Sequence, residues 1–309
     1  MNSFLVLFTL VWGIICLMAS SEAGPNNLTL AEKRVYDKLK QMQCGVISNQ
    51  IPGQKLRRRI TGGRKSYLLS QPWMALIYIP SDLDMCRCGG TLISERFILT
   101  AAHCFKMCPQ SKELKVRLGD LDLQTSPDCT TYNYQRVCAP PAEEFGIEKW
   151  SIHEEFDPFY PFFDIALLRL NRKVVFKVHI RPICLPLTDE LLAFSSVIGN
   201  SYMAVGWGKV DSRRFANSTM EVYIDTETCT AGLDSSFLCA NGNYVDTCVG
   251  DSGGPLTWQN FYFGTARTVQ FGVVSTGSRN CGAGKKAYYT DVPTYMPWIM
   301  AKLSEFPNI

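Results

Sequence analysis

Short apolar runs separated by turn-forming residues recur along the chain from residue 60 onward. The runs are rich in β-branched and aromatic residues, and clusters of Gly, Pro, Asn and Asp stand between them. Strands of this length and spacing are typical of an all-β sandwich or barrel, and about 250 residues fit one such unit. The clearest expected strands are Met74–Ile79, Phe97–Thr100, Ile165–Leu170, Ala204–Gly206 and Val269–Ser275.

Two segments carry apolar residues at helical spacing instead. The first, Thr29–Met42, begins at a threonine that can cap a helix. It lies in a polar and basic region, residues 24–59, that is too short to bury a core of its own. The second, Pro293–Phe306, predicts an amphipathic helix at the C-terminal end of the all-β unit.

The first residues predict the compartment. Phe4–Met18 is an apolar run too short to span a bilayer, and small residues follow it up to Ala23, as in a secretory signal peptide. No Lys or Arg precedes the run, so a short membrane anchor is the alternative. We expect residues 1–23 to be a signal peptide, 24–59 a propeptide and 60–309 the main domain of a secreted, extracellular protein.

The cysteine content agrees with an oxidising compartment. Of 13 cysteines only Cys16 falls in the expected signal peptide, which leaves an even number for disulfides. Structural zinc is not expected, because the chain has three histidines and no repeated Cys-x-x-Cys pair. The formal net charge of +3 gives no strong attraction to nucleic acid or to membranes.

Three local motifs carry candidate chemistry. His103 ends Thr-Ala-Ala-His, Asp164 begins Asp-Ile-Ala-Leu-Leu, and Ser252 lies in Gly-Asp-Ser-Gly-Gly-Pro. Each motif alone has a structural explanation: a core histidine, a strand-capping aspartate and a tight turn. A serine hydroxyl, however, is a poor nucleophile until a base removes its proton, and histidine titrates near neutral pH. The three motifs together indicate nucleophilic catalysis.

On these motifs the chain, from Ile60 to about Leu303, resembles the chymotrypsin/trypsin family of serine proteases. The resemblance implies two six-stranded antiparallel β-barrels, a C-terminal helix and an active site between the barrels. It implies a serine-type endopeptidase that needs no cofactor for catalysis. His103 would be the base, Asp164 would orient it and Ser252 would be the nucleophile. The N–H groups of Gly250 and Ser252 would form the oxyanion hole.

The resemblance also implies a substrate preference. Asp246 matches the base of the primary pocket in trypsin-like members, so Arg or Lys should precede the scissile bond, with the choice between them open. Thr247 keeps a hydroxyl beside it, and Ser275 and Gly277 match the segment that pairs with extended substrate. Ala287 departs from the glycine that is usual in the pocket wall, and its methyl group narrows the slot.

Arg59–Ile60 resembles the activation junction of the family's zymogens. Cleavage there would free the amine of Ile60, which in the family pairs with the aspartate before the serine, here Asp251. Leu56 does not fit a furin-like site, so we expect another trypsin-like protease to be the activator.

Family positions imply most of the disulfides. One expected disulfide would keep the propeptide attached through Cys44, and another would close a local loop between Cys129 and Cys138. The full set of expected pairs is Cys44–Cys184, Cys86–Cys108, Cys88–Cys104, Cys129–Cys138, Cys229–Cys239 and Cys248–Cys281.

The segment from Arg117 to Pro141 resembles the catalytic domains of arthropod clip-type proteases, in which this loop can bind calcium. A structural calcium ion and a solvated acidic loop are both open interpretations, and the candidate oxygen ligands are Asp120, Asp122, Thr125 and Asp128. A clip domain is not expected, because the propeptide has only one cysteine.

The subgroup resemblance implies an extracellular proteolytic cascade of insect-type immunity or development. Expected partners are protein substrates, an upstream activating protease and protein inhibitors, and the chain is expected to be a monomer. The rival class is a catalytically weak, protease-like binding protein. Asn27 and Asn217 begin N-glycosylation sequons, and His153 and His179 are expected to be ordinary surface or loop residues.

Overall fold

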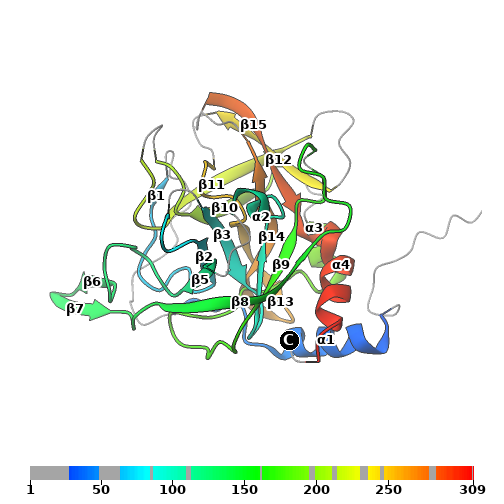
Figure 1. Cartoon of the computed structure of the whole chain (residues 1–309), viewed down its shortest axis with the longest axis horizontal. Coiled ribbons are helices and arrows are strands. Elements are labelled where there is room, and N and C mark those ends of the chain that lie inside the picture. Colours follow the sequence, from blue (N-terminus) through cyan, green and yellow to red (C-terminus); the bar gives the residue numbers. More distant parts are fainter. Residues whose placement is uncertain are drawn as a thin grey trace, which may run out of the picture.

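The computed structural model describes residues 28–48, 63–83, 86–108, 113–160, 162–194, 199–210, 214–229, 236–243, 247–277, 283–307 and 309 (Figure 1). Several predicted features lie outside these residues: the signal peptide, Asn27, Arg59, Ile60, Asp246 and Cys281.

The first half of the main domain forms a closed antiparallel barrel with the strand order β2-β3-β4-β9-β8-β5. The expected apolar runs Met74–Ile79 and Phe97–Thr100 supply β2 and β4, which are buried along their whole length. Because both faces of these strands are buried, polar and apolar residues do not alternate along them. The six strands are β2 (Met74–Tyr78), β3 (Arg87–Leu92), β4 (Phe97–Thr100), β5 (Lys115–Leu118), β8 (Glu143–Ile152) and β9 (Ala166–Leu170).

The second half forms a sheet in the order β1-β11-β10-β13-β14-β15-β12, and the pairing of β11 with β12 closes six of these strands into a second barrel. β1 (Arg64–Lys65) joins the barrel from outside, along β11. The predicted fold class is therefore confirmed. The barrel strands are β10 (Ser201–Gly206), β11 (Met220–Glu227), β12 (Phe237–Asn243), β13 (Pro255–Tyr262), β14 (Thr265–Thr276) and β15 (Ala283–Asp291).

Both predicted helices form. α1 (Leu30–Gln41) begins with a capping box between Thr29 and Glu32, and α4 (Val292–Ser304) is capped by the Asp291 side chain. The two helices lie against each other (Figure 1). Val35 and Leu39 of α1 are buried in the core of the main domain. The expected propeptide therefore docks on that domain through an apolar face.

Two short helices and one hairpin complete the fold. α2 (Cys104–Met107) and α3 (Asp189–Phe194) follow β4 and precede β10, respectively. The strands β6 (Cys129–Tyr132) and β7 (Gln135–Cys138) form a separate two-stranded sheet that projects from the first barrel (Figure 1). The tyrosine at its tip, Tyr134, is fully exposed.

Five expected disulfides are present among the described residues. They are Cys44–Cys184, Cys86–Cys108, Cys88–Cys104, Cys129–Cys138 and Cys229–Cys239. Cys248 is also disulfide-bonded, and its expected partner lies outside the described residues.

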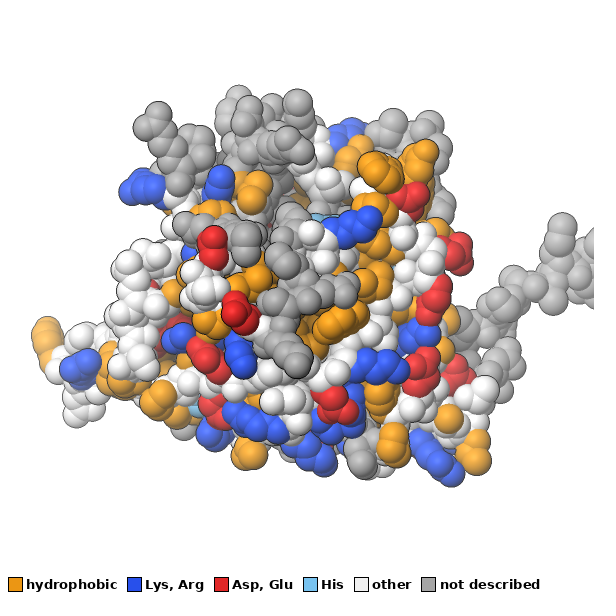
Figure 2. All heavy atoms as spheres, in the orientation of Figure 1, with side chains coloured by type: hydrophobic (Ala, Val, Ile, Leu, Met, Phe, Trp, Pro, Cys, Tyr) orange, Lys and Arg blue, Asp and Glu red, His pale blue; other side chains and the backbone are white. Residues whose placement is uncertain are grey.

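On the face shown in Figure 2, Lys and Arg side chains are interspersed with Asp and Glu, in keeping with the small net charge of +3. Within the described ranges, no helix combines the length and the apolar character needed to cross a membrane.

Candidate active site

Strand pairing brings His103 and Asp164 together. β4 and β9 run antiparallel, with Thr100 opposite Ala166. His103 follows the end of β4 by a few residues, and Asp164 precedes the start of β9. Because the C-terminal end of one strand lies beside the N-terminal end of the other, these two local motifs must meet at one edge of the barrel.

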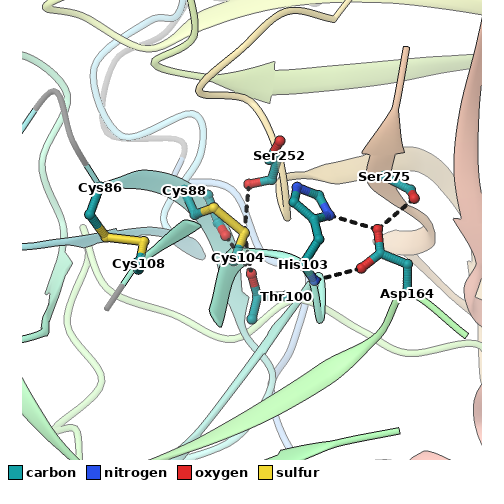
Figure 3. Close-up of a disulfide and its surroundings, with 10 residues drawn as sticks. Cys86, Cys88, Thr100, His103, Cys104, Cys108, Asp164, Ser252 and Ser275 are labelled. Atoms are coloured by element: carbon teal, nitrogen blue, oxygen red, sulfur yellow. Dashed lines mark hydrogen bonds and ion pairs between the residues drawn. A yellow bond between two sulfur atoms is a disulfide. The ribbon is translucent and has the colours of Figure 1, made fainter. Parts of the chain in front are cut away.

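The Asp164 carboxylate holds His103 by two hydrogen bonds. Its Oδ1 accepts the backbone N–H of His103 at 2.8 Å, and its Oδ2 lies 2.7 Å from His103 Nδ1 (Figure 3). Ser275 Oγ donates to the same Oδ2 at 2.5 Å. Burial alone would raise the pKa of Asp164, but the interactions with His103 and Ser275 bring it below its ordinary value. Since an ionised carboxylate can only accept, His103 Nδ1 carries the proton and Nε2 is left to act as a base.

Ser252 lies on the other side of the imidazole. Figure 3 places the His103 ring between Asp164 and Ser252. The serine turn is fixed to the first barrel, because the Ser252 carbonyl accepts the N–H of Gly89 at 2.7 Å. The described side chains of Ser252 and His103 do not share a hydrogen bond, and such catalytic bonds often tighten only when substrate binds.

Glycines shape the serine turn. Gly250 has φ +97°, and a Cβ at that position would lie 2.9 Å from Phe215 Cε1. Gly253 has φ +79°, and its Cβ would lie 2.2 Å from Thr100 Oγ1. A larger residue would be strained at either position. Within the described part of the chain, the N–H groups of Gly250 and Ser252 donate to no acceptor, so both can serve a ligand.

Asp251 is partly exposed as a residue, but its carboxylate is buried. Its Oδ1 accepts the N–H of Gly208 at 2.8 Å, and its Oδ2 accepts the N–H of Cys248 at 2.9 Å. Burial raises the pKa of Asp251 to about 6, although these two N–H groups lower it. Its predicted partner, the amine of Ile60, lies outside the described residues.

The predicted substrate pocket is described only in part, since Asp246 lies outside the described residues. Thr247 is buried, and its hydroxyl lies 3.2 Å from the Tyr289 hydroxyl. Ala287 is buried opposite Ala240 in the β12–β15 pair. Gly277 is exposed just beyond the end of β14. Ala287 therefore lies on a strand of the second barrel, whereas Thr247 and Gly277 lie in segments between its strands.

Sequence reasoning missed two side chains beside the site. It gave Ser275 a role in binding substrate backbone, but did not foresee its hydroxyl bond to Asp164. It also assigned nothing to Arg87, a buried residue of β3. Arg87 Nη1 donates to the carbonyls of Trp207 and Ala216 at 3.3 and 3.1 Å.

The Arg87 guanidinium also lies 4.4 Å from the centre of the Phe215 ring. Since Phe215 borders Gly250, the Arg87 guanidinium of the first barrel supports the loop beside the N–H groups of the predicted oxyanion hole. In the sequence, Arg87 stands out only as a charged residue directly before the apolar and small residues of β3.

The two remaining histidines are less exposed than expected. His179 lies in a loop, as predicted, but it is 3% exposed and its Nε2 lies 3.1 Å from the Pro141 carbonyl oxygen. His153 is partly buried, and its ring stacks between Phe163 and Trp298.

The sequence model of the trypsin family, described as Trypsin, matches residues 60–299. The chain belongs to the trypsin family. It is a serine-type endopeptidase by this membership, and the family predicted from the three motifs is confirmed.

Its relatives include insect proteases. Serine protease grass from Drosophila melanogaster is 39% identical over 259 residues, covering 80% of this chain and 68% of that protein. Melanization protease 1 from the same organism is 35% identical over 269 residues, covering 80% of this chain and 66% of that protein. The chain thus spans about two thirds of the length of these relatives.

A solved structure is similar as well. It is described as the crystal structure of the Drosophila Grass clip serine protease of the Toll pathway. The comparison gives a TM-score of 0.76 and 36% sequence identity, and it covers 88% of this chain and 78% of that chain. The expected similarity to arthropod clip-type proteases is confirmed.

Calcium binding and a solvated acidic loop are both open interpretations of residues 120–128, and Asp120 is the first candidate ligand to consider. It is buried, and neither of its carboxylate oxygens has a hydrogen bond, although Arg117 Nε lies 2.5 Å from Oδ2. Burial raises the pKa of Asp120 to about 6; the Arg117 charge lowers it, and the charges of Asp128 and Asp122 raise it. Arg117 already balances part of this buried charge, so a bound cation would have to add to that ion pair or replace it.

Like Asp120, which pairs with Arg117, the other three candidate ligands have partners. Asp128 accepts from the N–H of Leu121 and from Thr125 Oγ1, and Asp122 pairs with Lys65 at 2.8 Å. Among the residues that the structure describes, no group of three or more His, Cys, Asp or Glu side chains could hold a metal ion. Calcium here would need backbone oxygens or water besides Asp120, and its binding stays a prediction.

Proposed function

We propose that this protein is a secreted protease zymogen that, once cut after Arg59, hydrolyses peptide bonds after Arg or Lys. The observation that carries the proposal is the pair of hydrogen bonds that Asp164 accepts from His103, with Ser252 on the opposite side of the ring. An oriented imidazole beside a serine in a glycine turn is the arrangement that activates a hydroxyl nucleophile.

His103 Nε2 takes the proton from Ser252 Oγ as that oxygen attacks the scissile carbonyl. The negative charge that forms on the carbonyl oxygen is received by the N–H groups of Gly250 and Ser252, which have no other described acceptor. His103 then gives the proton to the leaving amine, and a water molecule hydrolyses the acyl group by the same route. Asp164 stabilises the imidazolium in both halves of the reaction.

Asp251 supports the zymogen part of the proposal. Its carboxylate is buried, with two backbone N–H partners and a pKa of about 6, so an ammonium beside it would be strongly favoured. Cleavage after Arg59 supplies that ammonium at Ile60. Because Asp251 lies between Gly250 and Ser252, pairing there would stabilise the turn that carries the oxyanion hole.

The preference for basic residues rests on Asp246. A carboxylate at the base of a narrow pocket binds a cationic side chain, and Ala287 narrows the wall. The disulfide between Cys44 and Cys184 would keep residues 24–59 attached to the protease after cleavage. The insect relatives support an extracellular cascade as the setting, with protein substrates and an upstream protease as partners.

The test is controlled activation. Replacing Leu56-Arg57-Arg58 by Ile-Glu-Gly makes a factor Xa site that still ends at Arg59 and frees Ile60. The cut protein is then profiled on a peptide library beside the uncut protein and a cut Ser252→Ala variant. We expect activity only in the cut parent, on bonds after Arg or Lys. An inactive cut parent would favour the binding-protein alternative, and cleavage after Phe, Tyr or Leu would reject the pocket assignment.

A further inference from the structure

Phe163, the residue directly before Asp164, has an unusual backbone conformation. Its φ is +58°, in the left-handed region that residues with a Cβ rarely adopt. Such outliers persist only where surrounding contacts enforce them, and they concentrate at functional sites.

An aromatic cluster surrounds the Phe163 ring. His153 stacks on it with ring centres 4.7 Å apart, and Tyr295 of α4 meets it edge-on at 6.2 Å. His153 also stacks on Trp298 of α4, with ring centres 5.2 Å apart. Trp298 is itself held by a 2.8 Å hydrogen bond from Nε1 to Glu154 Oε2. The cluster therefore joins the segment before Asp164 to the C-terminal helix.

The backbone on both sides of Asp164 is tied to the same cluster. The N–H of Phe163 donates to the Tyr295 hydroxyl at 3.3 Å, and the Phe163 carbonyl accepts the N–H of Ile165 at 2.8 Å. The Ile165 carbonyl accepts the N–H of His153 at 3.2 Å. The peptide groups flanking Asp164 therefore have fixed orientations.

We propose that Phe163 is a positioning residue for catalysis: the aromatic cluster of His153, Tyr295 and Trp298 holds its backbone left-handed and thereby aims the Asp164 carboxylate at His103. The proposal rests on the proposed function of Asp164. Both hydrogen bonds that Asp164 accepts from His103 depend on the direction in which the chain leaves Phe163. A change of this φ would turn the carboxylate away from at least one of the two His103 donors.

Three variants of the activated protein test the proposal. Phe163→Leu keeps an apolar side chain but removes the ring, whereas Phe163→Asn removes the ring and accepts the left-handed region readily. Tyr295→Phe removes only the hydroxyl that accepts the Phe163 N–H. The matched control is Phe156→Leu, a partly buried phenylalanine of the same loop without a left-handed φ.

The readout is kcat and KM for an Arg ester, with kcat divided by the active sites titrated in a burst assay. We expect Phe163→Leu to lower kcat about 10- to 100-fold with KM little changed, because small misplacements of catalytic groups cost this much. Phe163→Asn should recover most of kcat. Tyr295→Phe should give a smaller loss in the same direction, and Phe156→Leu should lower thermal stability only.

The proposal is overturned if Phe163→Leu and Tyr295→Phe keep the parent kcat per titrated site, or if Phe163→Asn is as impaired as Phe163→Leu. Ser252→Ala separates this failure from failure of the proposed function. An inactive Ser252→Ala beside a fully active Phe163→Leu rejects only the positioning role. Activity that persists in Ser252→Ala rejects the triad itself.

Discussion

Ser275 Oγ donates a hydrogen bond to Asp164 Oδ2 at 2.5 Å, and the same oxygen lies 2.7 Å from His103 Nδ1 (Figure 3). Asp164 belongs to the first barrel, whereas Ser275 lies on β14 of the second. The bond therefore crosses between the barrels. It links the orientation of the aspartate to the strand that carries Ser275 and Thr276, beside the predicted substrate pocket.

Removing this donor should weaken catalysis without removing the triad. In the activated protein, we expect Ser275→Ala to lower kcat/KM about 10-fold, or about 1.4 kcal/mol, since one hydrogen bond to a charged group is lost. Steady-state kinetics on an Arg ester measure the change, and Ser304→Ala on the exposed end of α4 is the control. An unchanged kcat/KM would mean that Ser275 does not support Asp164.

Asp251 predicts a pH dependence of stability in the uncut protein. Because its folded pKa of about 6 lies above the ordinary 3.8, the folded state binds the proton more tightly than the unfolded state. Stability from this group is therefore present below about pH 4 and is lost as pH rises through about 6, by up to about 3 kcal/mol.

We expect Asp251→Asn to remove this dependence. Urea unfolding of the uncut parent and the variant, at intervals between pH 4 and 7, gives the difference between them and cancels the contribution of other carboxyl groups. If the difference in unfolding free energy stays constant across this range, the buried carboxylate is not titrating as proposed.

The Cys44–Cys184 disulfide predicts a two-chain product. Protein cut after Arg59 should migrate as one species without reductant and as two fragments after reduction. Cys44→Ser with Cys184→Ser should lower stability by about 2–5 kcal/mol, because the bond closes a loop of 140 residues. Release of the short fragment from the cut parent without reductant would contradict the tether.

Calcium should raise the melting temperature if Asp120 lies in a cation site. A ligand that binds only the folded state stabilises it by about 2.7 kcal/mol at a hundred times its dissociation constant. Asp120→Asn should abolish the shift, and Asp157→Asn, a surface carboxylate in another loop, should not. No shift in the parent at millimolar calcium would reject the site.

The sequence predicted features that depend on local patterns. Apolar runs mark β2 and β4, and apolar residues at helical spacing mark α1 and α4. The all-β barrel class and both helices could therefore be predicted from the sequence. The contact between His103 and Asp164 could be predicted only from the family resemblance, because no local sequence rule pairs β4 with β9.

Contacts between distant segments were not predictable in the same way. The bond from Ser275 to Asp164 depends on how the two barrels face each other. The burial of His179 depends on Gly119, whose absent side chain leaves room for the imidazole. The left-handed Phe163 breaks the usual preference for Gly or Asn, and only its tertiary ring contacts explain it.

The most direct test of the proposed mechanism is labelling of the activated protein with a fluorophosphonate, followed by peptide mass mapping. Such a probe reacts with a serine only when a neighbouring base has activated it. We expect one phosphonyl group per cut molecule, on Ser252, with parallel loss of activity on an Arg ester. The uncut protein and the cut His103→Ala variant should remain almost unlabelled. An active protein that carries no label on Ser252, or a His103→Ala variant labelled at the parent rate, would contradict the proposed catalytic triad.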